Sequence, residues 1–298
     1  MRLTIIGCGS VAGVHAGRLR SAGLQIAAVC DSTVKKAESF ASAHGAERAT
    51  PDVLSALDGA DAVIVASPSA LHYEHALCAL ERGLHVLVEL PPCASVEQSE
   101  HLEQVAVQSN VVLQCAHTSR YLEPYRRAGD WIRETQLGEI RQVQYFRCVL
   151  PARRSWIDDA LLHHAAHPLD LFLHWFGSLQ PVGCAAFPPA APHRDVSLLA
   201  RLPNGAPAGI AISYSAKSAY SRLSVIGDEH TIMTDGFSFI DSGDSVMTWH
   251  GDAVASYEQA VTKQDLAFLG CCETGDGGIP WIETTRMMRQ MGAFQGLR

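Results

Sequence analysis

The sequence predicts an α/β protein: an N-terminal doubly wound parallel sheet, followed by an α+β domain with an open, largely antiparallel sheet. Three observations support this prediction. Apolar runs alternate with helix-like segments over the first 116 residues, a glycine-rich turn follows the first run, and short strands joined by turn residues replace the alternation later. We therefore expect two domains, a dinucleotide-binding domain at 1–116 and a substrate-binding and oligomerisation domain at 117–298.

Five apolar runs are predicted as strands of the N-terminal sheet. They are residues 3–7, 26–31, 61–68, 85–89 and 111–116. The segments between them have helix-like patterns, three of which end at Gly23, Gly45 and Gly83. Glycine suits the left-handed conformation that closes many helices. Because crossovers between parallel strands are right-handed, these units predict a doubly wound sheet.

The second half of the chain is predicted to contain a meander of short strands. Residues 121–138 and 167–177 read as helices on either side of a long alternating strand at 140–150. The meander and the helix that closes it are expected at 196–203, 206–216, 221–228, 231–237, 245–251 and 281–294. The Pro- and Ala-rich stretch 181–195 reads as a strand interrupted by a loop.

Composition excludes several classes of protein. The 298 residues are 47% hydrophobic and 18% charged, which is typical of a globular protein. A net charge of −8 argues against a nucleic-acid partner, and no run approaches the roughly 20 apolar residues of a membrane span. Nine cysteines without a CxxC spacing indicate reduced thiols, and the N-terminus lacks a signal-like apolar region, so we expect a cytoplasmic protein.

A glycine-rich turn lies between the first predicted strand and the first helix. It consists of Gly7, Cys8, Gly9, Ser10, Val11 and Ala12. In a GxGxxA turn the first glycine permits the tight turn, the second lets the backbone approach a pyrophosphate, and the alanine permits close packing of helix on strand. N–H groups that open the helix then face the anion. This context predicts a site for NAD or NADP.

Asp31, at the end of the second predicted strand, is placed to accept hydrogen bonds from the adenosine ribose. Its carboxylate repels a 2′-phosphate, which favours NAD over NADP. Ser32, Lys35 and Lys36 follow directly and leave NADP open, although the two lysines are also explained as a solvated helix face.

The stretches GCGSVA, VIVASPSALHYEHALCALERGLHVLVELPP, GEIRQVQ and HPLDLFLHWFG resemble the Gfo/Idh/MocA oxidoreductases. The resemblance implies an N-terminal Rossmann domain that binds NAD(P) and a C-terminal domain whose open sheet is often used for dimerisation. A homodimer or homotetramer is therefore expected. Further cofactor contacts are implied for Ser67, Pro68, His72, Glu89 and Leu90.

Two family motifs are altered. The family's Glu-Lys-Pro maps onto Glu89, Leu90 and Pro91; the resemblance implies that the carboxylate lies near the nicotinamide ribose, but leucine cannot replace the catalytic lysine. The family's Asp-x-x-x-His maps onto His163 and His167. The resemblance therefore implies that His167 is the general base, with a second imidazole where the aspartate stands.

Pro168 fits the first position of a helix, so His167 is expected at the helix start, where the dipole keeps an imidazole neutral. His163 is placed to share the proton. A metal site is the alternative, because four potential ligands have spacings that would line one helix face: His163, His167, Asp170 and His174. Pro168 interrupts such a helix, and we expect no metal.

Arginines near these histidines predict an anionic substrate. Arg153 and Arg154 match carboxylates as forked donors, unless they pair with Asp158 and Asp159. Additional substrate contacts are expected from Arg120, His117 and His164. The arrangement SW…LLHHAAHPLDL resembles one branch of the family, whose dicarboxylate substrate closes to a cyclic hemiacetal and is oxidised to a pyrone.

The sequence thus predicts an NAD(P)-dependent dehydrogenase that acts on a small anionic hydroxy or hemiacetal substrate. His167 is the expected base, and His163 assists it. Two alternatives remain open: a sugar or cyclitol dehydrogenase or reductase of the same family, and a catalytically idle NAD(P)-binding sensor. The sensor is suggested by Leu90 and His163, which replace two usual catalytic groups.

Overall fold

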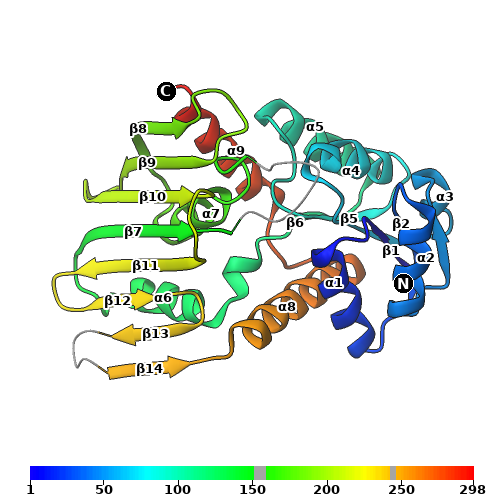
Figure 1. The fold of residues 1–298 in the computed structure, drawn as a ribbon, viewed down its shortest axis with the longest axis horizontal. Coiled ribbons are helices and arrows are strands. Elements are labelled where there is room, and N and C mark those ends of the chain that lie inside the picture. The colour runs from blue at the N-terminus through cyan, green and yellow to red at the C-terminus, as the bar shows by residue number, and fades with distance from the viewer. Residues whose placement is uncertain (151–158, 242–245) are drawn as a thin grey trace. The chain divides into compact units, whose positions relative to one another are not determined.

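A computed structural model describes residues 1–150, 159–241 and 246–298 (Figure 1). The chain forms two compact units: residues 1–117 with 261–286, and residues 118–260 with 287–298. From the sequence we placed all of 117–298 in one domain and assigned no element to residues 252–280. The difference has a packing cause, because Phe268 and Leu269 of α8 (Ala253–Thr274) belong to the apolar core of the first unit.

The first unit contains a six-stranded parallel sheet in the order β3-β2-β1-β4-β5-β6. The strands are β1 (Leu3–Ile6), β2 (Ile26–Cys30), β3 (Arg48–Thr50), β4 (Ala62–Val65), β5 (His85–Val88) and β6 (Leu113–Cys115). The predicted parallel sheet is confirmed. The sequence analysis missed β3, because its three residues are partly or fully exposed and form no apolar run.

Helices connect these strands, and two of them begin with a side-chain cap. The helices are α1 (Ser10–Ser21), α2 (Val34–His44), α3 (Val53–Leu57), α4 (His72–Leu80) and α5 (Val96–Ser109), with a 3₁₀ turn, η1 (Ser69–Leu71), before α4. Asp52 caps α3, and Ser95 caps α5 by accepting from the N–H of Gln98. Gly45 and Asn110 end α2 and α5 in the left-handed conformation.

The second unit contains an eight-stranded mixed sheet in the order β14-β13-β12-β11-β7-β10-β9-β8. Its strands are β7 (Ile140–Cys148), β8 (Gln180–Phe187), β9 (Asp195–Arg201), β10 (Pro207–Ser213), β11 (Tyr220–Gly227), β12 (Thr231–Thr234), β13 (Ser238–Asp241) and β14 (Val246–His250). Among the described residues only β7 and β10 pair in parallel, so the largely antiparallel sheet is confirmed. The expected loop after β8 contains two cis peptide bonds, before Pro188 and Pro192.

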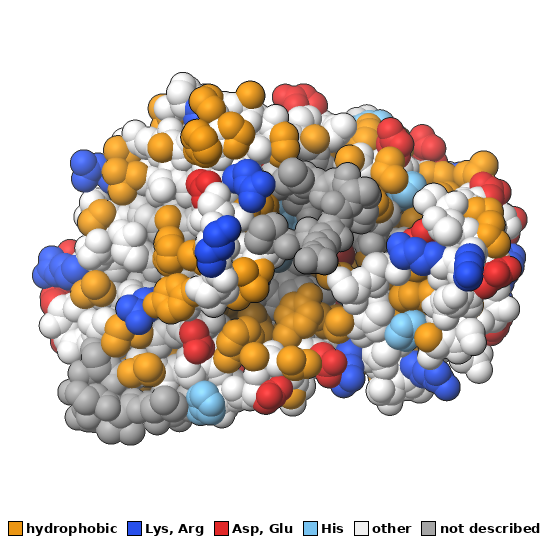
Figure 2. Space-filling view, in the orientation of Figure 1, with side chains coloured by type: hydrophobic (Ala, Val, Ile, Leu, Met, Phe, Trp, Pro, Cys, Tyr) orange, Lys and Arg blue, Asp and Glu red, His pale blue; other side chains and the backbone are white. Residues whose placement is uncertain are grey.

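Helices cover one face of this second sheet and leave the other open. They are η2 (Thr118–Tyr121), α6 (Glu123–Arg133) and α7 (Ala166–Phe176), and α9 (Trp281–Gln295) runs on into this unit. Phe146, Leu199 and Tyr220 are exposed on the strands, while Val143 and Tyr145 are buried. In the space-filling view, hydrophobic and basic side chains are interspersed over this sheet (Figure 2). None of the described helices is long and apolar enough to cross a membrane.

Candidate active site

The glycine-rich turn fits a pyrophosphate. Gly7 has φ +101, and a Cβ there would lie 2.3 Å from the carbonyl oxygen of Ala66, so this position requires glycine. A Cβ on Gly9 would meet no atom within 4 Å, which leaves open space beside the turn. Gly9 is the N-cap of α1 with no side-chain cap, and no acidic residue occupies the first turn. The N–H groups of Ser10 and its neighbours are therefore available to an anion.

Cys8, inside this turn, is not a reactive thiol. Burial, followed by the nearby Asp31 carboxylate, raises the pKa of Cys8 to about 12. Its Sγ lies 3.7 Å from the carbonyl oxygen of Cys30. A neutral thiol next to the predicted pyrophosphate site adds no negative charge there.

Asp31 organises the end of β2. One carboxylate oxygen accepts from the N–H of Cys8 at 3.2 Å and from Lys36 Nζ at 2.6 Å, and the other accepts from the N–H of Thr33 at 3.2 Å. Burial raises the pKa of Asp31, but the bonds from Lys36, Thr33 and Cys8 outweigh it and hold the pKa below its ordinary value. The side chain is a carboxylate at neutral pH, as recognition of a ribose diol requires.

Replacing Asp31 with serine should shift cofactor preference from NAD towards NADP. Loss of the carboxylate removes both the ribose acceptor and the repulsion of a 2′-phosphate, and it releases Lys36 to pair with that phosphate. We expect the ratio of the NADH and NADPH dissociation constants to change by roughly 10- to 100-fold, as fluorescence titration would measure. Lys35→Ala is the matched control and should leave the ratio unchanged. An unaltered ratio in Asp31→Ser would contradict this role.

His72 joins two backbone segments near the predicted nicotinamide position. Its Nδ1 lies 2.7 Å from the carbonyl oxygen of Pro91, and its Nε2 lies 2.7 Å from that of Ser67. Ser67 Oγ in turn contacts His75 Nδ1 at 2.9 Å. Both ring nitrogens of His72 are occupied by backbone, so this buried ring braces the Ser67–Pro68 turn. Direct contact between His72 and a cofactor stays a prediction.

Glu89 follows β5 and belongs to a buried chain of three side chains. His15 Nε2 lies 2.9 Å from Glu89 Oε1, and His15 Nδ1 lies 2.7 Å from Asp265 Oδ2. The side chain of His15 is 0% exposed, that of Asp265 1% and that of Glu89 15%. Burial alone lowers the pKa of His15, but Asp265 and then Glu89 outweigh it and raise it to about 10. His15 is thus an imidazolium between two carboxylates, and it fixes the orientation of Glu89.

Leu90 and His117 are both buried in the first unit. Leu90 is 3% exposed, and its peptide bond to Pro91 is cis. The position that carries lysine in the family is therefore filled by a packed apolar side chain. His117 is 1% exposed, and its Nε2 lies 2.9 Å from Thr284 Oγ1. The substrate contact expected of His117 stays a prediction.

The second unit brings three histidines together at the start of α7. Ring centroids of His163 and His164 are 4.5 Å apart, and each lies 6.3 Å from the ring of His167. His164 Nδ1 is 2.5 Å from the hydroxyl oxygen of Tyr214. The sequence analysis did not identify Tyr214, because no motif surrounds it and it joins the histidines only through the fold.

Helix α7 begins earlier than predicted. Its first residue is Ala166, so His167 is second and Pro168 is third rather than first. Ala165 already has αR backbone angles, and proline is tolerated throughout a first turn because those N–H groups have no intrahelical partner. His167 still lies in the first turn, at the positive end of the helix dipole.

Asp170 and Arg120 form a buried, bidentate ion pair. Arg120 Nε donates to Asp170 Oδ2 at 2.8 Å and Nη2 to Oδ1 at 2.6 Å, and the two side chains are 7% and 2% exposed. Asp170 is thereby engaged, and no group of three or more His, Cys, Asp or Glu side chains within the described residues is placed to hold a metal ion. Arg120, predicted to bind substrate, is already engaged with a carboxylate in this structure.

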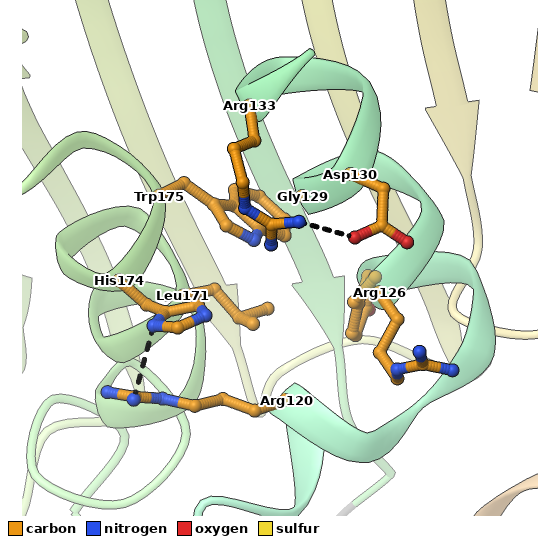
Figure 3. Close-up of a pocket in the computed structure, with 9 residues that line it drawn as sticks. Arg120, Arg126, Gly129, Asp130, Arg133, Leu171, His174 and Trp175 are labelled. Carbon is orange, nitrogen blue, oxygen red and sulfur yellow. Dashed lines mark hydrogen bonds and ion pairs between the residues drawn. The ribbon is translucent and has the colours of Figure 1, made fainter. Parts of the chain in front are cut away.

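Arg120 also borders a cavity of about 310 Å³ between α6 and α7 (Figure 3). There its Nη1 lies 3.3 Å from His174 Nδ1, and Arg133 pairs with Asp130 at 2.9 Å. Gly129 admits the indole of Trp175, whose Nε1 would be 2.7 Å from a Cβ. Arg153 and Arg154, the other predicted substrate arginines, lie outside the described residues.

A parallel sheet with a glycine turn, an acidic residue after its second strand and a histidine cluster in a second unit defines a dinucleotide-dependent oxidoreductase. Residues 1–117 match the oxidoreductase family with an NAD-binding Rossmann fold, and residues 125–233 match the GFO/IDH/MocA C-terminal domain. The chain belongs to the Gfo/Idh/MocA family of NAD(P)-dependent dehydrogenases. The predicted family and its NAD(P)-binding domain are confirmed.

The chain is similar to several characterised relatives. It is 29% identical over 189 residues to 4-carboxy-2-hydroxymuconate-6-semialdehyde dehydrogenase of Sphingobium sp., a match that covers 60% of each chain. It is 35% identical over 144 residues to D-glucoside 3-dehydrogenase of Escherichia coli, covering 47% of this chain and 41% of the relative. These matches thus span about half the length of the two relatives. Levoglucosan dehydrogenase in complex with NADH and levoglucosan shares the fold, with a TM-score of 0.88, 17% identity and coverage of 99% and 96%.

Proposed function

We propose that this protein is a dehydrogenase that transfers a hydride from a small anionic hydroxy or hemiacetal substrate to NAD, with His167 as the base. The observation that carries the proposal is the cluster of His163, His164 and His167 at the start of α7, in a chain whose lysine position is Leu90. A cluster of imidazoles supplies proton acceptors where the usual ammonium donor is missing. The semialdehyde named for the Sphingobium relative is a carboxylated substrate of this kind.

The chain's own residues supply binding, orientation and proton removal. The glycine turn and Asp31 would hold the nicotinamide cofactor, which would supply the hydride acceptor. His167, in the first turn of α7, takes the proton of the substrate hydroxyl, and the rings of His163 and His164 lie 6.3 Å from its ring, centroid to centroid. A hemiacetal hydroxyl is more acidic than a sugar alcohol, so a neutral imidazole suffices without lysine. Glu89, held by His15, would lie beside the nicotinamide ribose.

Substrate oxidation tests this proposal directly. We expect 4-carboxy-2-hydroxymuconate-6-semialdehyde to reduce NAD with a kcat/KM at least about 100-fold above that of D-glucose or scyllo-inositol. The rate is measured as the increase in absorbance at about 340 nm, where the reduced nicotinamide absorbs. Preference for the neutral polyols would instead assign the chain to the sugar and cyclitol dehydrogenases.

The idle sensor is the second candidate, favoured by Leu90, which is buried where a catalytic lysine stands in the family. A sensor would bind NADH and turn over neither the semialdehyde nor the polyols. Fluorescence titration with NADH, combined with the turnover assay, separates a sensor from both kinds of dehydrogenase.

The open face of the second sheet supports a homodimer or homotetramer. Exposed Phe146, Leu199 and Tyr220 lie on its strands beside a shallow hollow of about 520 Å³, which is floored by small residues such as Gly209 and Ala211. Exposed apolar side chains on a sheet are typical of association surfaces. All nine cysteines are free thiols, which supports a reducing compartment such as the cytoplasm.

A further inference from the structure

Arg147, on β7, carries a charge that no carboxylate of the described residues neutralises. Side chains alternate along the strand, so Arg147 projects to the same covered face as Val143 and Tyr145. Its neighbours there are tyrosines, and the ion pairs of the described chain do not include it. Arg120 and Arg133, by contrast, are each paired with an aspartate.

Neutral hydroxyl groups surround this guanidinium. Arg147 interacts with Tyr145, and Tyr125 interacts with Tyr145 and Ser221. Ser221 lies directly opposite Arg147 in the ladder between β11 and β7, and its Oγ is 3.5 Å from the hydroxyl of Tyr145. Burial raises the pKa of Tyr125 well above its ordinary value, so this hydroxyl stays protonated and contributes no negative charge.

The same guanidinium lies close to the histidine cluster. Ile212 of β10 pairs with Arg147 in the parallel ladder, and Tyr214 follows two residues later on the same face. Tyr214 interacts electrostatically with Arg147 and contacts His164 at 2.5 Å. Arg147 and Tyr214 therefore lie on one face of the second sheet, and Tyr214 contacts the histidine cluster, entirely within the second unit.

A guanidinium surrounded by neutral hydroxyl groups is stabilised by a bound anion. The guanidinium is always charged, and removing it from water without a counter-charge is costly. Its donors form a fork that matches a carboxylate with two parallel hydrogen bonds. Tyrosine hydroxyls at the edge of the fork add further donors and, being neutral, do not repel the ligand.

We propose that Arg147 receives a carboxylate of the substrate and that Tyr145 and Tyr214 flank it, so that the reacting hydroxyl faces the histidine cluster. This inference rests on the proposed function and specifies its substrate class: a planar acid with a carboxylate on the side away from the reacting carbon. Arg147 replaces Arg120 as the anion-binding arginine.

A binding experiment tests the site without turnover. The probes are pyridine-2,4-dicarboxylate, a planar stand-in for a cyclic dicarboxylate, and pyridine-2,4-dicarboxamide, which has nearly the same shape and no charge. Calorimetric titrations use the NADH-loaded wild type, Arg147→Met and Arg147→Lys. Arg222→Met is the matched control, because exposed Arg222 of β11 stacks on Tyr220 and its loss removes the same charge from the same sheet.

We expect Arg147→Met to lower the affinity for the dicarboxylate by roughly 10- to 100-fold and Arg147→Lys to lower it less. The affinity for the dicarboxamide should be the same in both variants as in wild type. Arg222→Met should match wild type. Equal dicarboxylate affinity in wild type and Arg147→Met, equal losses in both Met variants, or no binding by wild type at millimolar probe would overturn the proposal. If Arg147→Met fails to fold, unchanged affinity in Arg147→Lys overturns it as well.

The outcome separates this inference from the proposed function. If wild type binds the dicarboxylate through Arg147 but oxidises no semialdehyde, the anion site is supported and the dehydrogenase assignment is refuted. If wild type oxidises the semialdehyde and Arg147→Met does so with the same KM, the dehydrogenase assignment is supported and the anion site is refuted.

Discussion

Replacing His167 with alanine should lower kcat for semialdehyde oxidation by about 10²- to 10⁴-fold, because the variant lacks the base that accepts the hydroxyl proton. The change removes a group from the first turn of α7 and no hydrogen bond within the helix backbone. NADH affinity should stay at the wild-type value, since the cofactor residues lie in the first unit. Stopped-flow and steady-state measurements of NADH formation would separate the effect on kcat from that on KM.

His174→Ala is the matched control for this variant. His174 lies two turns further along α7, is exposed, and contacts Arg120. We expect its kcat to match wild type. Added imidazole should partly restore the activity of His167→Ala, which a variant that is merely misfolded would not show. An unchanged kcat in His167→Ala would contradict the assignment of the base.

Replacing His15 with leucine should destabilise the protein by roughly 3–5 kcal/mol, the usual cost of removing one partner from a buried ion pair. The substitution leaves the carboxylates of Asp265 and Glu89 without the cation between them. Urea unfolding followed by circular dichroism would measure the loss. The double variant His15→Leu/Asp265→Leu should recover part of it, because it also removes the most buried of the stranded charges.

The pH dependence gives this variant an independent signature. The pKa of His15 is about 10 in the folded protein, against an ordinary value of 6.5. Because this pKa is raised on folding, protonated His15 contributes its full stabilisation below about pH 6.5. Its contribution to the free energy of unfolding declines as the pH rises towards 10, by at most about 1.4 kcal/mol per pH unit. The stability difference between wild type and His15→Leu should shrink over that window. His101→Leu, an exposed imidazole on α5, should show no such trend.

The sequence was most informative where local backbone chemistry sets the structure. The turn at Gly7 requires a glycine for a steric reason that depends on a single neighbouring carbonyl, and Asp31 follows at the end of the next apolar strand. Such features recur with fixed spacing, so they are readable without coordinates. The parallel direction of the strands in the first sheet follows from the alternation of strands and helices. Strand β3 has no apolar run and could not be detected in this way.

Long-range pairing set the limit of prediction. Arg120 and Arg147 are both arginines near aromatic residues, and nothing in their local sequence shows that only the first meets a buried aspartate. Asp265 has no motif around it, yet it stabilises the charge of His15, which lies 250 residues earlier in the chain. Which partner satisfies a charged group is decided by the tertiary fold, so a single sequence identifies candidates and leaves their partners open.

The late packing of α8 into the first unit has a consequence for synthesis. When a ribosome has released residues 1–117, the strands of the parallel sheet are present, but Phe268 and Leu269 of its core are not. At typical elongation rates the missing segment follows only after roughly ten seconds or more. During that interval His15 and Glu89 lack Asp265, and the core of the first unit lacks the apolar side chains that α8 supplies. The fold of the first unit is completed only when most of the second has been made.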